Sequence, residues 1–264
     1  MNSTDLAQVF ARIPPLEDYA VEDFAVTPLP GYTNRNFRLH NHEIDWVLRI
    51  PRSETGRFID RNAEAHNQTL AHELEIAPQV LWRDDYGLSL TPTLGSSRTI
   101  QPADFSDETV LQLILEPIRK LHCSAIEFDG VVNLENLLTR YYSMLNESRQ
   151  QAFAERFQQA QSTLRSLVAE EGRYVASHND LVLENVLFEP GRVWLIDWEF
   201  SAMASPYWDL ATVCNAARLD PEQTQHLLEL YCCGNKKLDK SILLDFRQML
   251  QLLSDCWMAA VTVT

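Results

Sequence analysis

Short apolar runs separated by turn-forming residues dominate the first hundred residues. Runs rich in β-branched and aromatic side chains predict strands at 24–29, 35–40, 45–50, 79–82 and 86–91. Between the third and fourth of these, at 58–76, the apolar positions change to helical spacing, and the pattern stops before Pro78. The first part of the chain is therefore expected to form a small sheet with one long helix.

Helical periodicity dominates the rest of the chain. We expect helices at 107–122, 134–145, 150–170, 206–218, 221–232 and 241–260. A strand-rich insert interrupts them, with strands at 174–177, 186–189 and 193–196 and a turn at Pro190-Gly191. Residues 92–102 contain Pro, Gly and Ser and predict a linker. The pattern predicts an α+β chain with a sheet-plus-helix lobe joined to a larger, mainly helical lobe.

The charge of the chain restricts its partners. Its 264 residues hold 37 Asp and Glu against 22 Lys and Arg, for a net charge of −15. Binding to nucleic acid or insertion at an anionic membrane would require a basic face, so neither is expected. The 45% hydrophobic residues are typical of a globular protein, and no apolar run is long enough for a membrane span. Five scattered cysteines without a C-x-x-C pair favour reduced thiols and a cytoplasmic location.

The segment from Ser177 to Glu199 carries the clearest chemical pattern. Asp180 and Asn185 lie five positions apart in a short loop, and Asp197 ends an apolar strand after a hairpin turn. Phosphoryl transfer needs one carboxylate to accept the proton of the attacking hydroxyl, and hard oxygen ligands to hold Mg²⁺ on the phosphates. Asp and Asn also cap helices and form turns, which is the alternative interpretation of the same residues.

Three motifs in this region resemble a known family. His178-Asn179-Asp180 with Asn185, then 196–199 (IDWE) and 206–211 (PYWDLA), are similar to the choline/ethanolamine kinases in their bacterial LicA-like branch. That branch is grouped with the aminoglycoside phosphotransferases and thiamine kinases. In the first half, 31–37 (GYTNRNF), 47–51 (VLRIP) and 59–64 (IDRNAE) resemble the corresponding nucleotide-binding segments. The resemblance implies a two-lobe, protein-kinase-like fold with a nucleotide-binding lobe at 1–94 and a catalytic and acceptor-binding lobe at 95–264.

The resemblance also implies roles for individual residues. Asp180 would be the catalytic base, and Asn185 and Asp197 would hold Mg²⁺. Arg49 would contact the phosphates of ATP, with Glu64 orienting it. The phosphate-covering turn would contain Gly31, Thr33, Asn34 and Asn36. His178 would support the catalytic loop structurally, although a direct part in the chemistry stays open.

The distribution of lysine supports the prediction for Arg49. No lysine precedes Lys120, and Arg49 is the cation of the predicted strand 45–50. Its guanidinium has the fork geometry that a carboxylate and a phosphate require. An exposed arginine on an edge strand is the alternative. The chain has no G-x-G-x-x-G, Glu199 replaces the glycine of D-F-G, and no A-P-E follows, so a protein substrate is not expected.

The acceptor is expected to be a small cationic alcohol. Aromatic rings and carboxylates recognise quaternary ammonium groups, and the resemblance places Glu199, Trp208 and Trp257 in the acceptor pocket. Core packing is the alternative for each tryptophan. Choline or ethanolamine is the expected acceptor, and thiamine or an aminoglycoside is the alternative acceptor. A catalytically silent nucleotide-binding protein and a scaffold without nucleotide binding also stay open, as does the oligomeric state.

Overall fold

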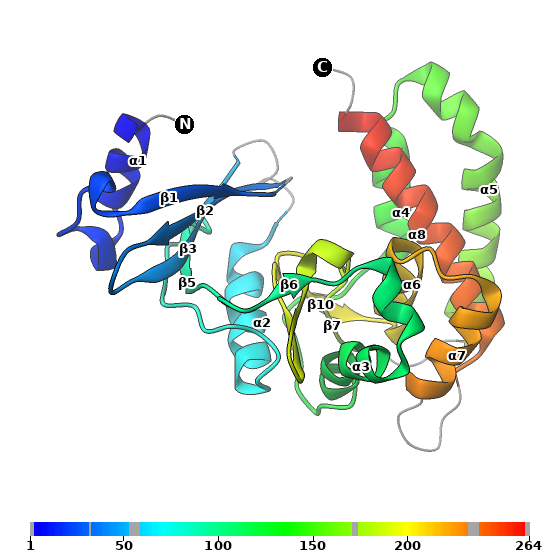
Figure 1. Ribbon diagram of the computed structural model, residues 1–264. Helices are drawn as coiled ribbons and strands as arrows, with labels where there is room; N and C mark the ends of the chain where they lie inside the picture. Colours follow the sequence, from blue (N-terminus) through cyan, green and yellow to red (C-terminus); the bar gives the residue numbers. More distant parts are fainter. Residues whose placement is uncertain (1–2, 32, 53–58, 171–173, 232–237, 262–264) are drawn as a thin grey trace. The chain divides into compact units, whose positions relative to one another are not determined.

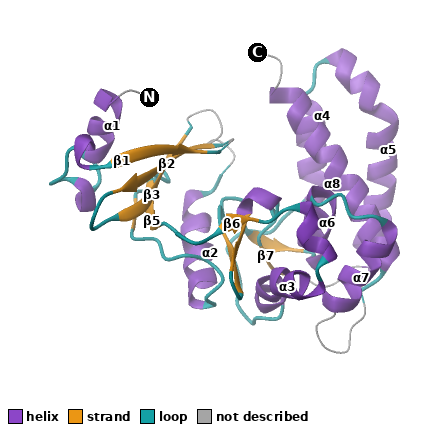
Figure 2. Cartoon of the chain, in the orientation of Figure 1, coloured by secondary structure: helices purple, strands orange, loops and turns teal. Residues whose placement is uncertain are grey.

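The chain forms two compact units. The computed structural model describes residues 3–31, 33–52, 59–170, 174–231 and 238–261, and the units comprise Met1–Ser97 and Arg98–Thr264. The first unit contains an antiparallel sheet and the second is mainly helical (Figures 1 and 2). The predicted α+β class is confirmed. The division between the units falls within the predicted linker.

An antiparallel sheet organises the first unit. Its order is β1-β2-β3-β5-β4, with β1 (Ala25–Leu29), β2 (Asn34–His40), β3 (Asp45–Pro51), β4 (Trp82–Arg83) and β5 (Ser89–Pro92). The register pairs Leu48 with Phe37 on one side and with Leu90 on the other. Leu39, Leu48 and Leu90 are fully buried in one apolar cluster, because alternate residues of a strand face the same side.

Two α-helices lie in the described part of the first unit. Helix α1 (Ser3–Phe10) contributes Leu6 and Phe10 to the same apolar cluster, and the sequence pattern did not predict it. Helix α2 (Arg61–Glu73) begins at Asp60, whose side chain accepts hydrogen bonds from Asn62 N and Ala63 N at 3.0 and 3.1 Å. Such a cap satisfies backbone donors that have no partner in the helix. The start of α2 therefore fixes Glu64 in its first turn. Residue 58 of the predicted helix lies outside the described residues.

The second unit combines helices with two small sheets. The helices are α3 (Glu108–His122), α4 (Leu134–Ser143), α5 (Glu147–Glu170), α6 (Pro206–Ala216), α7 (Pro221–Tyr231) and α8 (Lys240–Val261). The strands are β6 (Arg98–Thr99), β7 (Val175–Ser177), β8 (Val186–Glu189), β9 (Arg192–Leu195) and β10 (Ala202–Ala204), in the orders β6-β8-β9 and β10-β7. Helices α4, α5 and α8 pack side by side (Figure 2). None of the described helices is long and apolar enough to cross a membrane.

Apart from the unpredicted helix α1, the main differences from the predicted elements concern short strands. Strand β6 lies inside the segment predicted to be a linker, and β10 was not predicted. Strand β4 shares only Trp82 with the predicted strand 79–82, and β5 begins three residues later and ends one residue later than the predicted strand 86–91. Strands of two or three residues are too short to show a period. Their pairing depends on partners far away in the sequence, such as Ala202 with Ser177.

The sheet of the first unit generates a stability prediction. Leu48 is 0% exposed on β3, which has neighbours on both sides, so truncation would leave a cavity in the core. We expect Leu48→Ala to lower the free energy of unfolding by about 2–5 kcal/mol in urea denaturation. Val47→Ala is the matched control, because Val47 lies on the opposite face and is only partly buried. Equal losses for the two variants would contradict this assignment of the core.

Candidate active site

The loop after β7 brings the predicted catalytic residues together. The side-chain nitrogen of Asn185 donates to the carbonyl oxygen of Asp180 at 2.9 Å and to its carboxylate Oδ2 at 3.0 Å. The carbonyl of Asn185 accepts a hydrogen bond from Ile196 N at 3.0 Å, at the end of the β8–β9 hairpin. Because Asp197 follows Ile196 directly, the hairpin places it beside the Asp180–Asn185 pair.

Carboxylates crowd around Asp180. Burial, together with the negative charges of Asp197 and Glu199, raises the pKa of Asp180 to about 7, while the hydrogen bond from Asn185 opposes the rise. Like charges held close together disfavour a further ionised carboxylate. Raised pKa values of this kind are common at sites where a proton is transferred. Asp180 therefore has the environment of a general base in a strongly negative site.

Tyr141 on α4 also belongs to this environment. Burial raises the pKa of its hydroxyl, and the charge of Asp180 raises it further. Its position could not be predicted from the sequence, because no motif links α4 to the loop. The structure therefore adds an aromatic side chain with a polar end near the candidate base.

The backbone before Asp180 has an uncommon conformation. Asn179 has φ 66° and Asp197 has φ 64°, in the left-handed region that costs about 1–3 kcal/mol for a residue with a side chain. Asp209 at the start of α6 accepts from His178 N at 2.9 Å and from Asn179 N at 2.7 Å. The indole nitrogen of Trp208 donates to the carbonyl of Asn179 at 2.9 Å. Helix α6 thus holds this strained peptide from both sides.

His178 links the loop to the β8–β9 hairpin. Its ring contacts Ile196 O through Nε2 at 2.9 Å, and its Nδ1 accepts from Asp180 N at 3.3 Å. This pattern assigns the proton to Nε2 of a neutral ring. Burial lowers the pKa of His178, which agrees with that assignment. The two ring nitrogens of His178 therefore bind backbone atoms on either side of the carboxylate cluster, and its ring packs against that of Trp198 at 4.6 Å.

The three residues predicted for the acceptor differ in their surroundings. Glu199 is buried at 6% exposure and contributes to the field at Asp180. Trp208 is also buried, and its indole contacts the loop after β7 through the carbonyl of Asn179. Trp257 on α8 is partly exposed. Of the three residues predicted for the acceptor, Glu199 is thus the one whose charge acts on the candidate base Asp180.

The first unit contains a cluster of charged side chains around Glu64. The predicted partner Arg49 pairs with Glu64 Oε1, and Arg61 lies 2.6 Å from Oε2. Arg83 adds a third guanidinium at 3.7 Å from Oε1. Burial would raise the pKa of Glu64, but these three arginines hold it below its usual value. The buried carboxylate of Glu64 is therefore ionised, and it holds the guanidinium groups of three arginines close together.

Arg61 and Arg83 are the members of this cluster that sequence reasoning missed. Arg61 precedes Glu64 by three residues on α2, a spacing that already indicates a side-chain pair. Arg83 joins only through sheet register, because Arg49 and Arg83 both pair with Ser89 and so share one face of the sheet. That register is not visible in the sequence.

The predicted phosphate-covering residues lie in the turn between β1 and β2 and at the start of β2. A Cβ atom at Gly31 would lie 2.6 Å from Asn34 O and 2.8 Å from the side-chain nitrogen of Asn36, so a larger residue does not fit there. Asn36 donates to Pro30 O at 3.1 Å, and Asn34 donates to Thr33 Oγ1 at 3.1 Å. Gly31 and Thr33 therefore lie in the turn, and Asn34 and Asn36 lie at the start of β2 directly beside it. Tyr32, which belongs to the same motif, is outside the described residues.

The donor set beside Asp180 fits a magnesium ion. The nitrogen of the Asn185 amide faces Asp180, so its oxygen lies on the other side, and Asp197 offers carboxylate oxygens. Mg²⁺ prefers such hard oxygen ligands and keeps several positions for water and phosphate. Among the described residues, no three His, Cys, Asp or Glu side chains group as a metal site. Asn185 and Asp197 would thus supply only two protein ligands to the ion. Oxygens of water and phosphate would fill its remaining positions.

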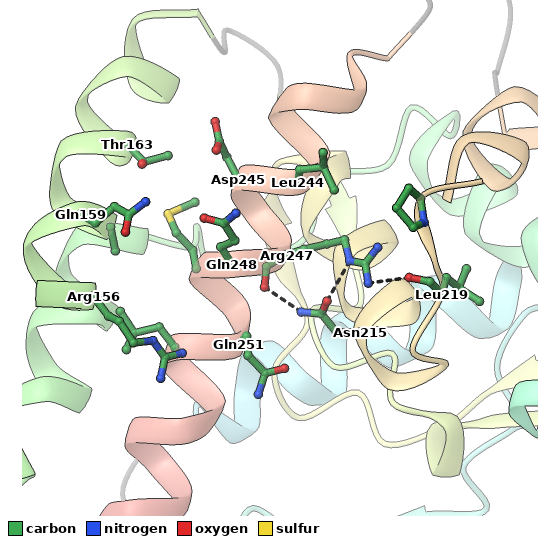
Figure 3. A pocket seen from close by; sticks show the side chains of 14 residues that line it. Arg156, Gln159, Thr163, Asn215, Leu219, Leu244, Asp245, Arg247, Gln248 and Gln251 are labelled. Atoms are coloured by element: carbon green, nitrogen blue, oxygen red, sulfur yellow. Dashed lines mark hydrogen bonds between the residues drawn. The ribbon is translucent and has the colours of Figure 1, made fainter. Parts of the chain in front are cut away.

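A separate cavity of about 530 Å³ lies among α5, α6, α7 and α8 (Figure 3). Arg247 on α8 borders it and donates to Asn215, Thr224 and the carbonyl of Leu219 at 2.7–3.0 Å. These bonds tie α8 to α6 and to the start of α7. None of the predicted site residues lines this cavity, so it is distinct from the candidate active site.

Comparison with known proteins places these features in a family. The model of the phosphotransferase enzyme family matches residues 25–241. Two curated LicA proteins of Haemophilus influenzae are similar to this chain: one is 30% identical over 221 residues and the other, from strain ATCC 51907, is 31% identical over 220 residues. The alignments cover 80% and 79% of this chain, but 63% and 80% of those relatives. The chain thus spans less than two thirds of the first relative.

Solved structures show the same similarity. A choline/ethanolamine kinase family protein from Mesorhizobium loti is 26% identical, with a TM-score of 0.80 over 97% of this chain and 85% of that one. A structure of LicA in complex with AMP is 22% identical, with a TM-score of 0.79 over 89% of this chain and 83% of that one. The predicted kinase-like fold is confirmed. Since the family model matches most of its length, the chain belongs to the phosphotransferase enzyme family.

Proposed function

We propose that the chain is an ATP-dependent kinase that moves the γ-phosphate of ATP to the hydroxyl group of choline or ethanolamine. The observation that carries this proposal is the Asp180 carboxylate, held by the amide of Asn185 and crowded by Asp197 and Glu199. A general base needs a defined position and a pKa near the working pH. Asp180 has both.

Asp180 would act on the hydroxyl of the acceptor. Its carboxylate accepts the hydroxyl proton while the oxygen forms a bond to the γ-phosphorus. The bond between the γ-phosphorus and the β,γ-bridging oxygen breaks, and its electron pair leaves with ADP. Mg²⁺ held by Asn185 and Asp197 would neutralise the charge on the phosphates.

The first unit would bind the nucleotide. Arg49 is anchored by Glu64 and by hydrogen bonds of 3.3 and 3.4 Å to Gly87 O, so its guanidinium is fixed before ATP arrives. A fixed guanidinium loses little conformational entropy when it binds a phosphate oxygen. The turn with Gly31 and Thr33, together with Asn34 and Asn36 at the start of β2, would cover the phosphates with its amide groups.

The acceptor would be cationic because the catalytic site is negative. Asp180, Asp197 and Glu199 lie in one electrostatic cluster, and such a cluster attracts an ammonium group. We assign Glu199 and Trp257 to the acceptor pocket. For Trp208 we propose a supporting role, because its indole binds the carbonyl of Asn179 in the loop before Asp180. The names of the relatives favour choline or ethanolamine, whereas thiamine and aminoglycosides share the same charge and hydroxyl chemistry. The need for ATP agrees with a cytoplasmic location.

A panel of acceptors tests the substrate class. The protein is incubated with Mg-ATP and choline, ethanolamine, thiamine or an aminoglycoside, and ADP release is measured by a coupled assay. We expect release above the no-acceptor background with choline or ethanolamine, because both present a hydroxyl on a small cation. Turnover with thiamine or the aminoglycoside alone would replace the proposed acceptor. Tight Mg-ATP binding without turnover on any acceptor would instead support the silent nucleotide-binding alternative.

Substitution of the candidate base tests the assignment of the chemistry. We expect Asp180→Asn to lower kcat by about a hundredfold or more, since the amide cannot accept the hydroxyl proton. Glu184→Gln is the matched control: Glu184 is an exposed carboxylate in the same loop, and its loss should leave kcat within about twofold. If Asp180→Asn kept wild-type kcat, Asp180 would not be the base.

Substitution of Arg49 tests the nucleotide site. We expect Arg49→Met to raise the KM for ATP by about tenfold or more, because a charge-assisted contact to phosphate is lost. Arg12→Ala is the control, since Arg12 pairs with Asp84 on the surface of the same unit at 3.0 Å and exposed pairs contribute little. An unchanged KM for ATP in a folded Arg49→Met variant would show that Arg49 does not contact the nucleotide.

A further inference from the structure

The tight turn that joins β4 to β5 contains Gly87. Oδ1 of Asp84 accepts hydrogen bonds from Tyr86 N at 2.9 Å and from Leu88 N at 2.8 Å, and Gly87 N donates to the carbonyl of Asp84 at 3.1 Å. Gly87 is buried and has φ 88°, a conformation that glycine adopts without steric cost. Arg12 pairs with the other oxygen of Asp84, Oδ2, so that exposed pair is separate from the bonds that shape the turn.

The carbonyl of Gly87 binds the arginine that is predicted to contact the phosphates of ATP. It accepts hydrogen bonds from Nη2 and Nε of Arg49 at 3.3 and 3.4 Å. Nη2 of Arg49 also pairs with Oε1 of Glu64 on α2. The guanidinium is therefore held by acceptors from two elements, the turn before β5 and the first turn of α2. A planar guanidinium bound to two acceptors has few orientations left.

The Cα atom of Gly87 lies against a second arginine. A Cβ atom at this position would lie 2.7 Å from Nε of Arg61 and 2.9 Å from its Cδ and Cζ, closer than the about 3.5–4.0 Å at which non-bonded atoms pack. Arg61 is itself fixed, because its Nη1 lies 2.6 Å from Oε2 of Glu64 and its side chain is 10% exposed. The absence of a side chain at Gly87 therefore leaves the room that the guanidinium of Arg61 occupies.

Glu64 keeps the two guanidinium groups apart. Its Oε1 pairs with Arg49 and its Oε2 with Arg61, and Arg83 adds a third positive charge to the cluster. Because like charges repel strongly at a partly buried site, each arginine keeps its place while its own carboxylate oxygen is within reach. If Arg61 were displaced from Oε2, its charge would remain beside Arg49 and compete for Oε1. Gly87 borders both arginines and so controls both contacts.

We propose that Gly87 is a positioning residue of the nucleotide site: its carbonyl orients Arg49 toward the phosphates of ATP, and its lack of a side chain keeps Arg61 on the other oxygen of Glu64. The turn between β4 and β5 thus acts on the nucleotide through Arg49. The placement of the two arginines concerns the first unit alone, whereas its effect on ATP rests on the proposed function.

Substitutions by alanine separate crowding of Arg61 from backbone strain. Gly87→Ala adds the atom for which the structure has no room. Gly191→Ala is the matched control, because Gly191 has φ 81° in the β8–β9 turn and a Cβ atom there meets nothing within 4 Å. Both variants carry the strain of alanine in the left-handed region. The double variant Arg61→Ala/Gly87→Ala keeps this strain and removes the crowding, and Arg61→Ala is its reference.

Two measurements test the proposal on the full chain. The Kd for Mg-ATP is measured by calorimetry without an acceptor, and solvent exchange of the Nε proton of Arg49 is followed by nitrogen-15 NMR without nucleotide. We expect Gly87→Ala to raise the Kd by about fivefold or more and to speed the exchange by about threefold or more. Gly191→Ala should match the wild type in both. In the Arg61→Ala background, Gly87→Ala should change the Kd by less than about twofold, because the group that it would crowd is gone.

The comparison between the two backgrounds decides between positioning and local strain. The proposal is overturned if a folded Gly87→Ala variant keeps the wild-type Kd or the wild-type exchange of Arg49. It is also overturned if Gly87→Ala raises the Kd equally with and without the side chain of Arg61, or if Gly191→Ala raises it as much. If Gly87→Ala does not fold while Gly191→Ala does, the double variant must fold, and its failure to do so overturns the proposal.

Failure of the proposed function would look different. A wild-type protein that does not bind Mg-ATP would remove the nucleotide site, and the absence of turnover with every acceptor would remove the kinase proposal. In either case the exchange of the Arg49 proton still reports whether Gly87 holds the guanidinium. Faster exchange in Gly87→Ala than in Gly191→Ala would then keep the structural part of the inference, and unchanged exchange would overturn it.

Discussion

The buried carboxylate of Asp209 makes the interactions on which the candidate active site in the second unit depends. It is fully buried, and it takes hydrogen bonds from His122 and from the amides of His178 and Asn179. Because a buried charge is costly unless it is satisfied, α3, α6 and the loop after β7 must meet at this point. The left-handed peptide of Asn179, and with it the direction of Asp180, follows from that meeting.

The two units carry opposite charge excesses at their candidate sites. In the first unit one carboxylate, Glu64, faces three guanidinium groups. In the second, Asp180, Asp197 and Glu199 share one negative field. The arginine cluster around Glu64 suits a polyphosphate, and the carboxylates around Asp180 suit cations. Mg-ATP together with an ammonium acceptor provides both kinds of ligand. A net charge of −15 is thus compatible with nucleotide binding, because three guanidinium groups are gathered around Glu64.

Part of the site was predictable because local spacing determines it. Asp180, Asn185 and Asp197 come together through a short loop and a hairpin, and Arg49 meets Glu64 through one strand and one helix turn. The rest depends on long-range packing. Arg83 joins through sheet register and Tyr141 through the docking of α4. The contact between His122 and Tyr231 joins residues 109 positions apart, and no periodicity or motif encodes such a pair.

The central claim is that this site transfers a phosphoryl group from ATP to the hydroxyl group of choline or ethanolamine. Phosphorus-31 NMR of the protein with Mg-ATP and choline tests it most directly, because the method identifies the product as well as the loss of ATP. The account predicts a new phosphomonoester resonance that grows in step with ADP. Unchanged ATP, or ATP converted to ADP and inorganic phosphate without any ester under the same conditions and with ethanolamine in place of choline, would contradict it.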